Sequence, residues 1–270
     1  MRVAVLSDIH GNSIALDAVM RDVEARGGAD GYWVLGDLAA LGFDPAGVLE
    51  RVVRLPGALL VRGNTDRYLV TGARPGPTTE QCRANPVLWP ARVEVASSFG
   101  WTQGMVTASG WVEWLAALPL EQRTTLPDGT RVLCVHAAPG LDEAPGVHRG
   151  TAAEELSAMG RASKADLLFV GHTHVPTDVT VDGVRLVNVG CVSNAFPPDL
   201  RAGYTLLEAD EFGWRLDHRR VAYDREAAIE GLKKINHPAA DFIVRQLRGE
   251  NPRPEWYNIP HGAHPDSPSM

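Results

Sequence analysis

Residues 2–12 read RVAVLSDIHGN, a short apolar run that leads directly into polar side chains. The apolar, β-branched beginning predicts a buried strand. Asp8 and His10 follow at its carboxyl end, where an extended or turning backbone can direct both side chains toward one ion. Asn12 or Ser13 then predicts the start of a helix, because both residue types cap helix N-termini. This stretch therefore predicts a strand, a pair of ligand side chains and a helix in succession.

The same pattern recurs along the chain. Further apolar runs at residues 31–35, 58–62, 131–135 and 167–170 lead into Gly36-Asp37, Gly63-Asn64, His136 and Gly171-His172-Thr173-His174. Helices between the early strands, one of them starting at Asp44-Pro45, imply parallel pairing with right-handed crossovers. Polar groups at the carboxyl ends of neighbouring strands converge on one crevice in an open α/β sheet. We therefore expect a single site.

Residues 67–125 interrupt this alternation. We expect a mainly helical insertion there, with helix from Thr78 to about Leu118, because apolar residues recur at i, i+3, i+4 and i+7. The residues at this spacing are Trp111, Trp114, Leu115 and Leu118. The tryptophan-rich segment is interpreted as a packed helical core. The alternative is a cap over the crevice that selects the substrate.

The remaining part of the chain returns to strands. A helix whose N-cap is Thr151 is expected before the strand at residues 167–170. Short alternating runs with turns at Asp182-Gly183 and near Phe212-Gly213 then predict antiparallel hairpins. These runs cover residues 177–181, 185–188, 204–208 and 214–219, and two terminal helices cover 224–235 and 239–248.

Length and composition agree with a globular protein. The 270 residues, 44% hydrophobic and 22% charged, can form one large domain or two small ones. We expect one α/β domain over residues 1–250, which contains the insertion. Residues 251–270 are rich in proline and are expected to form an extended C-terminal tail.

Charge and cysteine content restrict the partners. The formal net charge of −7 disfavours binding to nucleic acid or anionic membranes. It does not disfavour a small phosphorylated substrate, because bound metal ions reverse the local field. The three cysteines, Cys82, Cys134 and Cys191, are widely separated and fit a reducing cytosol. No apolar run has the length of a signal-peptide core or a membrane span, so we expect a cytoplasmic protein.

The side chains at the predicted strand ends suit divalent metal ions. Seven of them offer oxygen or nitrogen ligands: Asp8, His10, Asp37, Asn64, His136, His172 and His174. This number is enough for two ions that share one carboxylate. Mixed ligation without thiolate favours Mn²⁺, Fe, Zn²⁺, Ni²⁺ or Co²⁺ over Ca²⁺ or Mg²⁺, with Mn²⁺ preferred here. Two such ions, about 3.5–4 Å apart, can hold the attacking and leaving oxygens of an in-line displacement at phosphorus.

Taken in order, these motifs resemble those of the calcineurin-like metallophosphoesterase superfamily. The extended forms Asp8-Ile9-His10-Gly11-Asn12 and Gly171-His172-Thr173-His174-Val175-Pro176 resemble its small bacterial and archaeal phosphodiesterase branch. The resemblance covers about residues 1–220. It implies a four-layer α/β/β/α sandwich around two sheets, so that residues 1–250 would be a metallophosphoesterase domain with a helical insertion.

The resemblance also implies roles for the individual residues. Asp8, His10 and His174 would hold one metal ion, whereas Asn64, His136 and His172 would hold the other. Asp37 would bridge the two ions. A metal-bridging hydroxide would be the nucleophile, because the ions lower the pKa of bound water. Asp37, Asn64 and His136 are the residues to which we assign catalytic roles.

One position departs from the family pattern. Many relatives have histidine after the Gly-Asn pair, where it protonates the leaving group or stabilises the transition state, whereas this chain has Thr65. Threonine is a poor proton donor at neutral pH, and losing such help costs about 10²–10⁴ in rate. Asp66 or a neighbouring arginine could partly substitute. Arg62 and Arg67 are nevertheless expected to be ordinary surface or ion-pair residues.

Other polar residues have simpler interpretations. Asn12 is expected to be a helix cap with a possible second role in the site, and Cys191 a small buried residue. Five further histidines lie outside any motif and are expected at the surface: His148, His218, His237, His261 and His264.

The leading functional prediction is a dinuclear metal-dependent phosphoesterase acting on small phosphomonoesters or phosphodiesters, including nucleotides or cyclic nucleotides. One alternative is a dinucleoside-polyphosphate hydrolase. Another is a non-catalytic scaffold, as in the retromer subunit that resembles this family. Retention of all seven ligand residues argues against the scaffold. A nuclease is disfavoured by the acidic charge balance. The insertion and the tail could each form a homo-oligomer interface.

Overall fold

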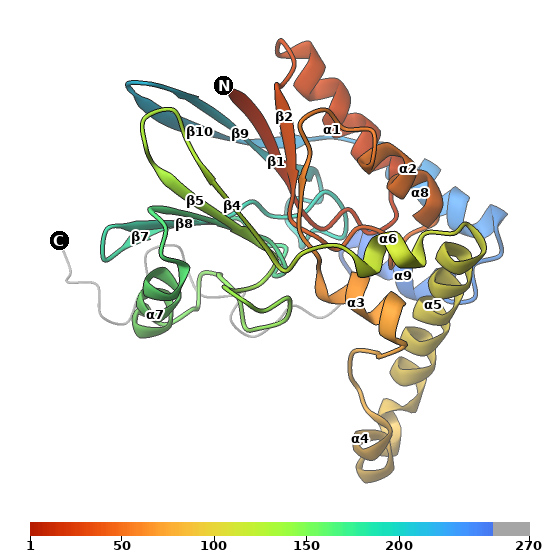
Figure 1. Cartoon of the computed structure of the whole chain (residues 1–270). Coiled ribbons are helices and arrows are strands. Elements are labelled where there is room, and N and C mark those ends of the chain that lie inside the picture. The colour runs from red at the N-terminus through yellow and green to blue at the C-terminus, as the bar shows by residue number, and fades with distance from the viewer. Residues whose placement is uncertain (251–270) are drawn as a thin grey trace.

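Two five-stranded mixed sheets pack face to face in the computed structural model, which describes residues 1–250. The first sheet has the order β10-β9-β1-β2-β3 and the second β4-β5-β6-β8-β7 (Figure 1). The strands are β1 Arg2–Leu6, β2 Gly31–Val34, β3 Leu59–Leu60, β4 Glu121–Thr125, β5 Arg131–Val135, β6 Leu167–Val170, β7 Thr177–Val181, β8 Val184–Asn188, β9 Ala202–Asp210 and β10 Gly213–Val221. The tail expected at 251–270 lies outside the described residues.

The central strands are buried on both faces, which explains their continuous apolar sequences. Successive residues alternate between two cores, as the pleat of a strand requires. In β1, Val3 faces the core between the sheets and Ala4 faces the helices over the first sheet. In β6, Phe169 faces the core between the sheets and Leu168 faces the helix over the second. Parallel pairing of β1 with β2, and of β2 with β3, confirms the parallel pairing expected at the beginning of the chain.

Helices cover both outer faces and complete four layers. Those over the first sheet are α1 Ser13–Ala25, α2 Pro45–Val52, α3 Asn64–Thr71, α5 Trp89–Ala108 and α6 Val112–Ala116, and α7 Ala153–Ser163 covers the second. The remaining helices are α4 Thr79–Ala84, the short 3₁₀ helix η1 Pro86–Leu88, α8 Arg225–Lys234 and α9 Ala240–Arg248. The α/β/β/α sandwich is confirmed. Within residues 1–250, no helix combines the length and apolar character needed to cross a bilayer.

Local signals in the sequence set the helix starts as predicted. The Asn12 side chain accepts a hydrogen bond from the backbone N–H of Ala15 and caps α1. Asp44 caps α2 in the same way, with Pro45 as its first residue. Both predicted hairpin turns are also present, joining β7 to β8 and β9 to β10.

The insertion is helical through α4, η1, α5 and α6, and α4 projects away from the sheets (Figure 1). Trp111 and Trp114 pack against the core beneath the first sheet, as the helical spacing predicts. The structure adds a strand that the sequence analysis did not anticipate. Residues 121–125 read EQRTT and carry no apolar signal, yet they form β4 by antiparallel pairing with β5.

Three predictions about individual residues outside the insertion were wrong. Helix α7 begins after Ala152, so Thr151 is not its N-cap. The Thr151 hydroxyl instead accepts the N–H of His148 and donates to the carbonyl of Gly146. His148 and His237 are buried and not at the surface. Both histidines lie in loops, where sequence periodicity carries no information about burial.

His237 is packed in an environment that favours its neutral form. Its ring contacts Trp101 with centroids 4.5 Å apart, and its Nδ1 accepts the N–H of Ala239. Burial lowers the pKa of His237 to about 4, compared with an unfolded value of 6.5. Between these values the unfolded chain binds the proton and the folded chain does not. This contribution to stability is therefore complete above pH 6.5 and is lost as the pH falls toward 4.

We predict that His237→Asn flattens the dependence of stability on pH. Asparagine keeps an acceptor for the Ala239 N–H but does not titrate. Urea unfolding of metal-free protein at pH 7, 6 and 5 should show a smaller loss of free energy for the variant than for wild type. Equal losses in both proteins would contradict the assignment of a neutral buried imidazole.

Candidate functional site

The structure places all seven predicted ligand residues at the carboxyl ends of strands. Asp8 and His10 follow β1, Asp37 follows β2, Asn64 begins α3 after β3, His136 follows β5, and His172 and His174 follow β6. The two sheets present these ends on the same side of the sandwich. Side chains from the first sheet therefore meet side chains from the second, and all seven come together.

One group consists of Asp8, His10 and His174. The two histidine Nε2 atoms are 3.1 Å apart, and Asp8 Oδ1 lies 3.7 Å from His10 Nε2 and 3.2 Å from His174 Nε2. Ligand atoms from these three residues are close enough to share one metal ion. Carboxylate and imidazole donors without a thiol suit a first-row divalent cation.

The hydrogen bonds of this group fit a cation at its centre. His10 Nδ1 faces the carbonyl of Ala40 at 3.0 Å, and His174 Nδ1 faces that of Asn194 at 2.9 Å. Each Nδ1 must carry a proton to donate to its carbonyl, so in the neutral rings both Nε2 lone pairs point at each other. A proton or a metal cation must lie between them. Asp8 Oδ1 is fully buried and makes no hydrogen bond within the described chain, so it is also available to a cation.

The second group consists of Asn64, His136 and His172. Asn64 Oδ1 lies 3.0 Å from His136 Nε2 and 3.0 Å from His172 Nδ1. His136 Nδ1 is 2.6 Å from the carbonyl of Leu35, which leaves the Nε2 lone pair of the neutral ring directed at the amide oxygen. An oxygen and two imidazole nitrogens thus converge from α3 and from the second sheet.

Asp37 lies between the two groups and offers one oxygen to each. Its Oδ2 is 3.8 Å from His10 Nε2, and its Oδ1 is 3.5 Å from His136 Nε2. The backbone N–H of Thr65 donates to Oδ1 at 2.9 Å and fixes the orientation of the carboxylate. Ligand atoms of Asp37, Asp8 and His136 also lie within 4.8 Å of one another, close enough to share one metal ion. Each carboxylate oxygen of Asp37 therefore lies nearer to a different one of the two groups.

The backbone at the site is strained. Five of the seven ligand residues have the left-handed conformation that non-glycine residues rarely adopt: Asp8, His10, Asp37, His172 and His174. Each such residue costs about 1–3 kcal/mol, and such residues cluster at functional sites. Close approach adds a second constraint, because a Cβ at Gly171 would lie 1.9 Å from Ser7 Oγ and one at Gly63 2.0 Å from Asp37 Oδ1. The turns are held in these positions by their neighbours.

Burial and neighbouring charges act in opposite directions on different ligand residues. Burial lowers the pKa of His10 and of His172, so both rings are neutral at pH 7. Burial alone would raise the pKa of Asp8, but the His174 imidazole holds it well below its usual range. The same pair acts in reverse on His174, whose pKa the Asp8 carboxylate raises well above the ordinary value despite burial. Asp8 is therefore ionised and requires a positive partner, which a proton on His174 or a metal ion supplies.

The carboxylate of Asp66 supports the turn at Asp37 through hydrogen bonds. Its Oδ2 accepts the backbone N–H groups of Asp37 and Gly63, and its Oδ1 accepts that of Leu38, each at 2.9 Å. The side chain is completely buried. Both oxygens are thus engaged, which argues against the suggested role of Asp66 in assisting the leaving group.

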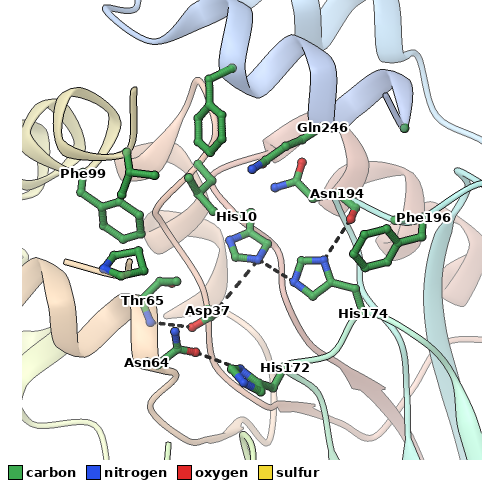
Figure 2. Close-up of a pocket in the computed structure, with 16 residues that line it drawn as sticks. His10, Asp37, Asn64, Thr65, Phe99, His172, His174, Asn194, Phe196 and Gln246 are labelled. Carbon is green, nitrogen blue, oxygen red and sulfur yellow. Dashed lines mark hydrogen bonds and ion pairs between the residues drawn. The ribbon is translucent and has the colours of Figure 1, made fainter. Parts of the chain in front are cut away.

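A cavity of about 300 Å³ opens above the ligand residues. Figure 2 shows His10, Asp37, Asn64, His172 and His174 at its base, with Phe99 and Phe196 on opposite sides. The insertion contributes Val95 and Phe99 of α5, so it forms part of the cavity wall as well as part of the core. The rest of the wall includes Leu41, Pro75, Asn194, Ala195, Phe242 and Gln246.

Thr65 lies at the base of this cavity, and its hydroxyl is buried without a hydrogen-bond partner in the described structure. Arg62 and Arg67 both pair with the carboxylate of Asp142, at 2.9 and 3.0 Å, which confirms them as ion-pair residues. Cys191 is buried, as expected, with its Sγ 3.8 Å from the carbonyl of His174.

Comparison with known proteins decides the family. A model of the calcineurin-like phosphoesterase superfamily domain matches residues 1–211. The chain belongs to this superfamily. Membership supports hydrolysis of phosphoester bonds, and the superfamily is metal-dependent, in agreement with the candidate ligand residues. The resemblance inferred from the sequence motifs is confirmed.

Individual relatives of this superfamily member are similar over most of their length. An uncharacterized protein of Methanocaldococcus jannaschii is 27% identical over 251 residues, 87% of this chain and 93% of that protein. A crystal structure of a metallophosphoesterase from Sphaerobacter thermophilus has a TM-score of 0.72 at 25% identity, covering 93% of this chain and 99% of that one. The fold also matches a hypothetical protein from Pyrococcus horikoshii, with a TM-score of 0.73 at 20% identity over 91% and 97% of the two chains.

The sequence analysis missed two residues at this metallophosphoesterase site, Asn194 and Gln246, and it gave Asp66 a different role. The role of Asp66 as a buried acceptor had a local signal, since an acid three residues after the N-cap residue Gly63 can accept the backbone N–H of that residue at the start of α3. Asn194 and Gln246 had none. Both reach the cavity from segments whose placement depends on long-range packing.

We predict that Asp66→Asn weakens metal binding about 10- to 100-fold, the range found for residues that orient ligands. The amide nitrogen would face a backbone N–H in place of an acceptor, costing about 1–3 kcal/mol of unfolding free energy. Titration calorimetry with Mn²⁺ and urea unfolding measure the two effects. Asp241→Asn, an exposed carboxylate on α9, is the control and should change neither. If Asp66→Asn binds Mn²⁺ as tightly as wild type, the turn at Asp37 keeps its conformation without the Asp66 carboxylate.

Proposed function

We propose that the protein is a dinuclear metal-dependent hydrolase of small phosphomonoesters or phosphodiesters. The observation that carries the proposal is the position of Asp37, with one carboxylate oxygen toward each of two three-residue ligand groups. A single-ion site needs no such bridge. Superfamily membership supports the reaction class.

In this proposal Asp8, His10 and His174 hold one ion, Asn64, His136 and His172 hold the other, and Asp37 contacts both. Mn²⁺ is the proposed metal, because the donor set mixes carboxylate, amide and imidazole without thiolate. When bound, such ions lower the pKa of water and stabilise the charge that develops on a phosphoryl group.

The protein's own groups prepare the site for this chemistry. Bonds from the histidine Nδ1 atoms to backbone carbonyls fix each ring with its Nε2 lone pair directed inward, as for His10, His136 and His174. The apolar wall above them excludes water and strengthens electrostatic interactions with a bound phosphate. Hydrogen bonds from buried donors orient the substrate, and the unpaired hydroxyl of Thr65 is one such donor.

Among residues 1–250, no side chain at the base of the cavity other than the proposed metal ligands is a strong proton donor for a leaving group. The Thr65 hydroxyl can donate a hydrogen bond but is a poor acid. Arg62 and Arg67 are held by Asp142 and are not free to replace a histidine. We therefore propose that the enzyme acts best on esters whose leaving groups depart without protonation.

The first prediction concerns the metal content. Wild type loaded with Mn²⁺ should bind about two ions per chain and hydrolyse bis(4-nitrophenyl) phosphate. Asp37→Ala and His136→Ala should each bind less metal and lose more than about 100-fold in kcat/KM, because each ion supplies several kcal/mol of transition-state stabilisation. Elemental analysis and a chromogenic assay measure the two effects.

The control for these variants is His218→Ala. His218 is a half-exposed histidine on β10 that pairs with Asp178 and belongs to neither ligand group. It should retain wild-type metal content and rate. Equal activity in all four proteins would overturn the dinuclear proposal, and a fully loaded wild type that hydrolyses no phosphoester would favour the scaffold alternative.

The second prediction concerns Thr65→His. An imidazole at this position should raise kcat for esters with poor alkyl leaving groups by at least about 10², the lower end of general-acid effects. The rate with 4-nitrophenyl esters should change little, since that leaving group needs no proton. Steady-state rates are measured for a series of esters whose leaving groups increase in pKa. A plot of log kcat against leaving-group pKa should have a shallower slope for the variant than for wild type. Parallel slopes would show that leaving-group protonation is supplied elsewhere.

A further inference from the structure

The cavity above the ligand residues is closed by a segment that lies beyond the matched family domain. That domain ends at residue 211, whereas Phe242 and Gln246 of α9 line the cavity wall. Opposite them stands Phe99 of α5, and the loop after β8 adds Asn194 and Phe196 (Figure 2). Three parts of the chain thus build one wall around the space where a bound ester would extend from the metal ions.

An ion pair and apolar packing connect the parts of this wall. Arg245 of α9 forms a two-point ion pair with Glu94 of α5, with N–O distances of 2.7 and 2.8 Å. Ile243 and Leu247 anchor the opposite face of α9 in the core that it forms with α8. At the end of the helix, a Cβ on Gly249 would lie 2.9 Å from Pro197, so α9 and the 194–200 loop are in close contact. The shape of the cavity is therefore a property of the folded chain.

Two amide side chains in this wall each leave one polar atom unpaired, although Asn194 Oδ1 accepts a hydrogen bond from the Ser193 hydroxyl at 3.4 Å. Asn194 Nδ2 and Gln246 Oε1 have no hydrogen-bond partner in the described structure. Figure 2 shows both side chains directed toward the middle of the cavity. Leaving such a group unsatisfied costs about 1–3 kcal/mol, so a ligand that supplies a donor and an acceptor gains by pairing with them. Neither amide contributes to the proposed ligand set.

The chemistry of the wall indicates what it binds. Phe196 and Phe242 are partly exposed and offer aromatic surfaces to a flat ring, whereas Phe99 is buried and contributes only an apolar boundary. The unpaired amide atoms match the donor and acceptor edge of a nitrogen heterocycle. No arginine or lysine is among the described residues that line the cavity, so additional phosphate groups would lack a charged partner. A volume of about 300 Å³ is at the lower end for small-molecule sites and admits one such group.

We propose that α9 and the 194–196 loop form a specificity site for a nucleobase, so that the substrate is an ester of a nucleoside phosphate with no further phosphate groups. This inference rests on the proposed function. Gln246 is its specificity-determining residue, since it acts on the base and does not contact the reacting phosphorus. The absence of cationic side chains from the wall disfavours the dinucleoside-polyphosphate alternative.

The test uses three phosphodiesters that share one leaving group. Each carries 4-nitrophenolate, with methyl, phenyl or thymidine as the group that remains on phosphorus, and the Mn²⁺-loaded full-length protein is assayed. The nucleoside ester should have a KM about tenfold below that of the methyl ester, with the phenyl ester between them. Gln246→Leu keeps the shape of the side chain and removes its hydrogen bonds. It should raise the nucleoside KM about 3- to 10-fold, a typical effect of one lost hydrogen bond, and leave kcat and the methyl KM unchanged.

Arg248→Gln, on the exposed face of α9, is the matched control and should leave all three KM values unchanged. Calorimetric binding of thymidine 5′-monophosphate provides a readout that is independent of turnover. If no ester is hydrolysed but Gln246→Leu weakens this binding, the specificity site stands and the proposed function fails. If the esters are hydrolysed with equal KM and Gln246→Leu changes nothing, the specificity site is overturned and the proposed function stands.

Discussion

The carboxylate of Asp8 joins the two sheets at the point where the site is built. Its Oδ2 accepts the backbone N–H of His172, which fixes the turn after β6 to the turn after β1. Its Oδ1 faces His10 Nε2 at 3.7 Å and His174 Nε2 at 3.2 Å. One side chain thus links the turns that follow β1 and β6 and supplies a candidate ligand atom to the space between them. The fold and the site share a single electrostatic constraint.

That constraint explains why the turns are strained. A left-handed backbone at five of the ligand residues directs their side chains into the gap between the sheets. The conformational free energy that this costs is compensated by the packing of the surrounding structure. Several acceptor atoms with few donors then face one another, a repulsive arrangement in the metal-free chain. A cation that binds only the folded protein would relieve it and would stabilise the fold by mass action. Stability and metal occupancy are expected to rise together.

The sequence was sufficient for the parts of the molecule in which local pattern and tertiary structure agree. Short apolar runs gave the central strands, and the polar residues that end them located the site. β4 was missed because its polar sequence is held by pairing with β5 and not by its own propensity. Burial of His237 and the position of Gln246 were missed for a related reason, since both depend on how distant helices pack. Local sequence pattern predicts which residues form the site, but the shape of the cavity around them depends on tertiary packing.

Strand order has a consequence for how the protein is made. β9 pairs directly with β1, so the first sheet is incomplete until residues beyond 202 have been synthesised. The last wall of the cavity, α9, comes later still. Long-range pairings of this kind slow folding, because distant segments lose conformational entropy when they meet, before they gain stabilising contacts. The ribosome-bound chain therefore carries its ligand residues without an assembled site, and hydrolytic capacity should arise late, together with the final docking of α9.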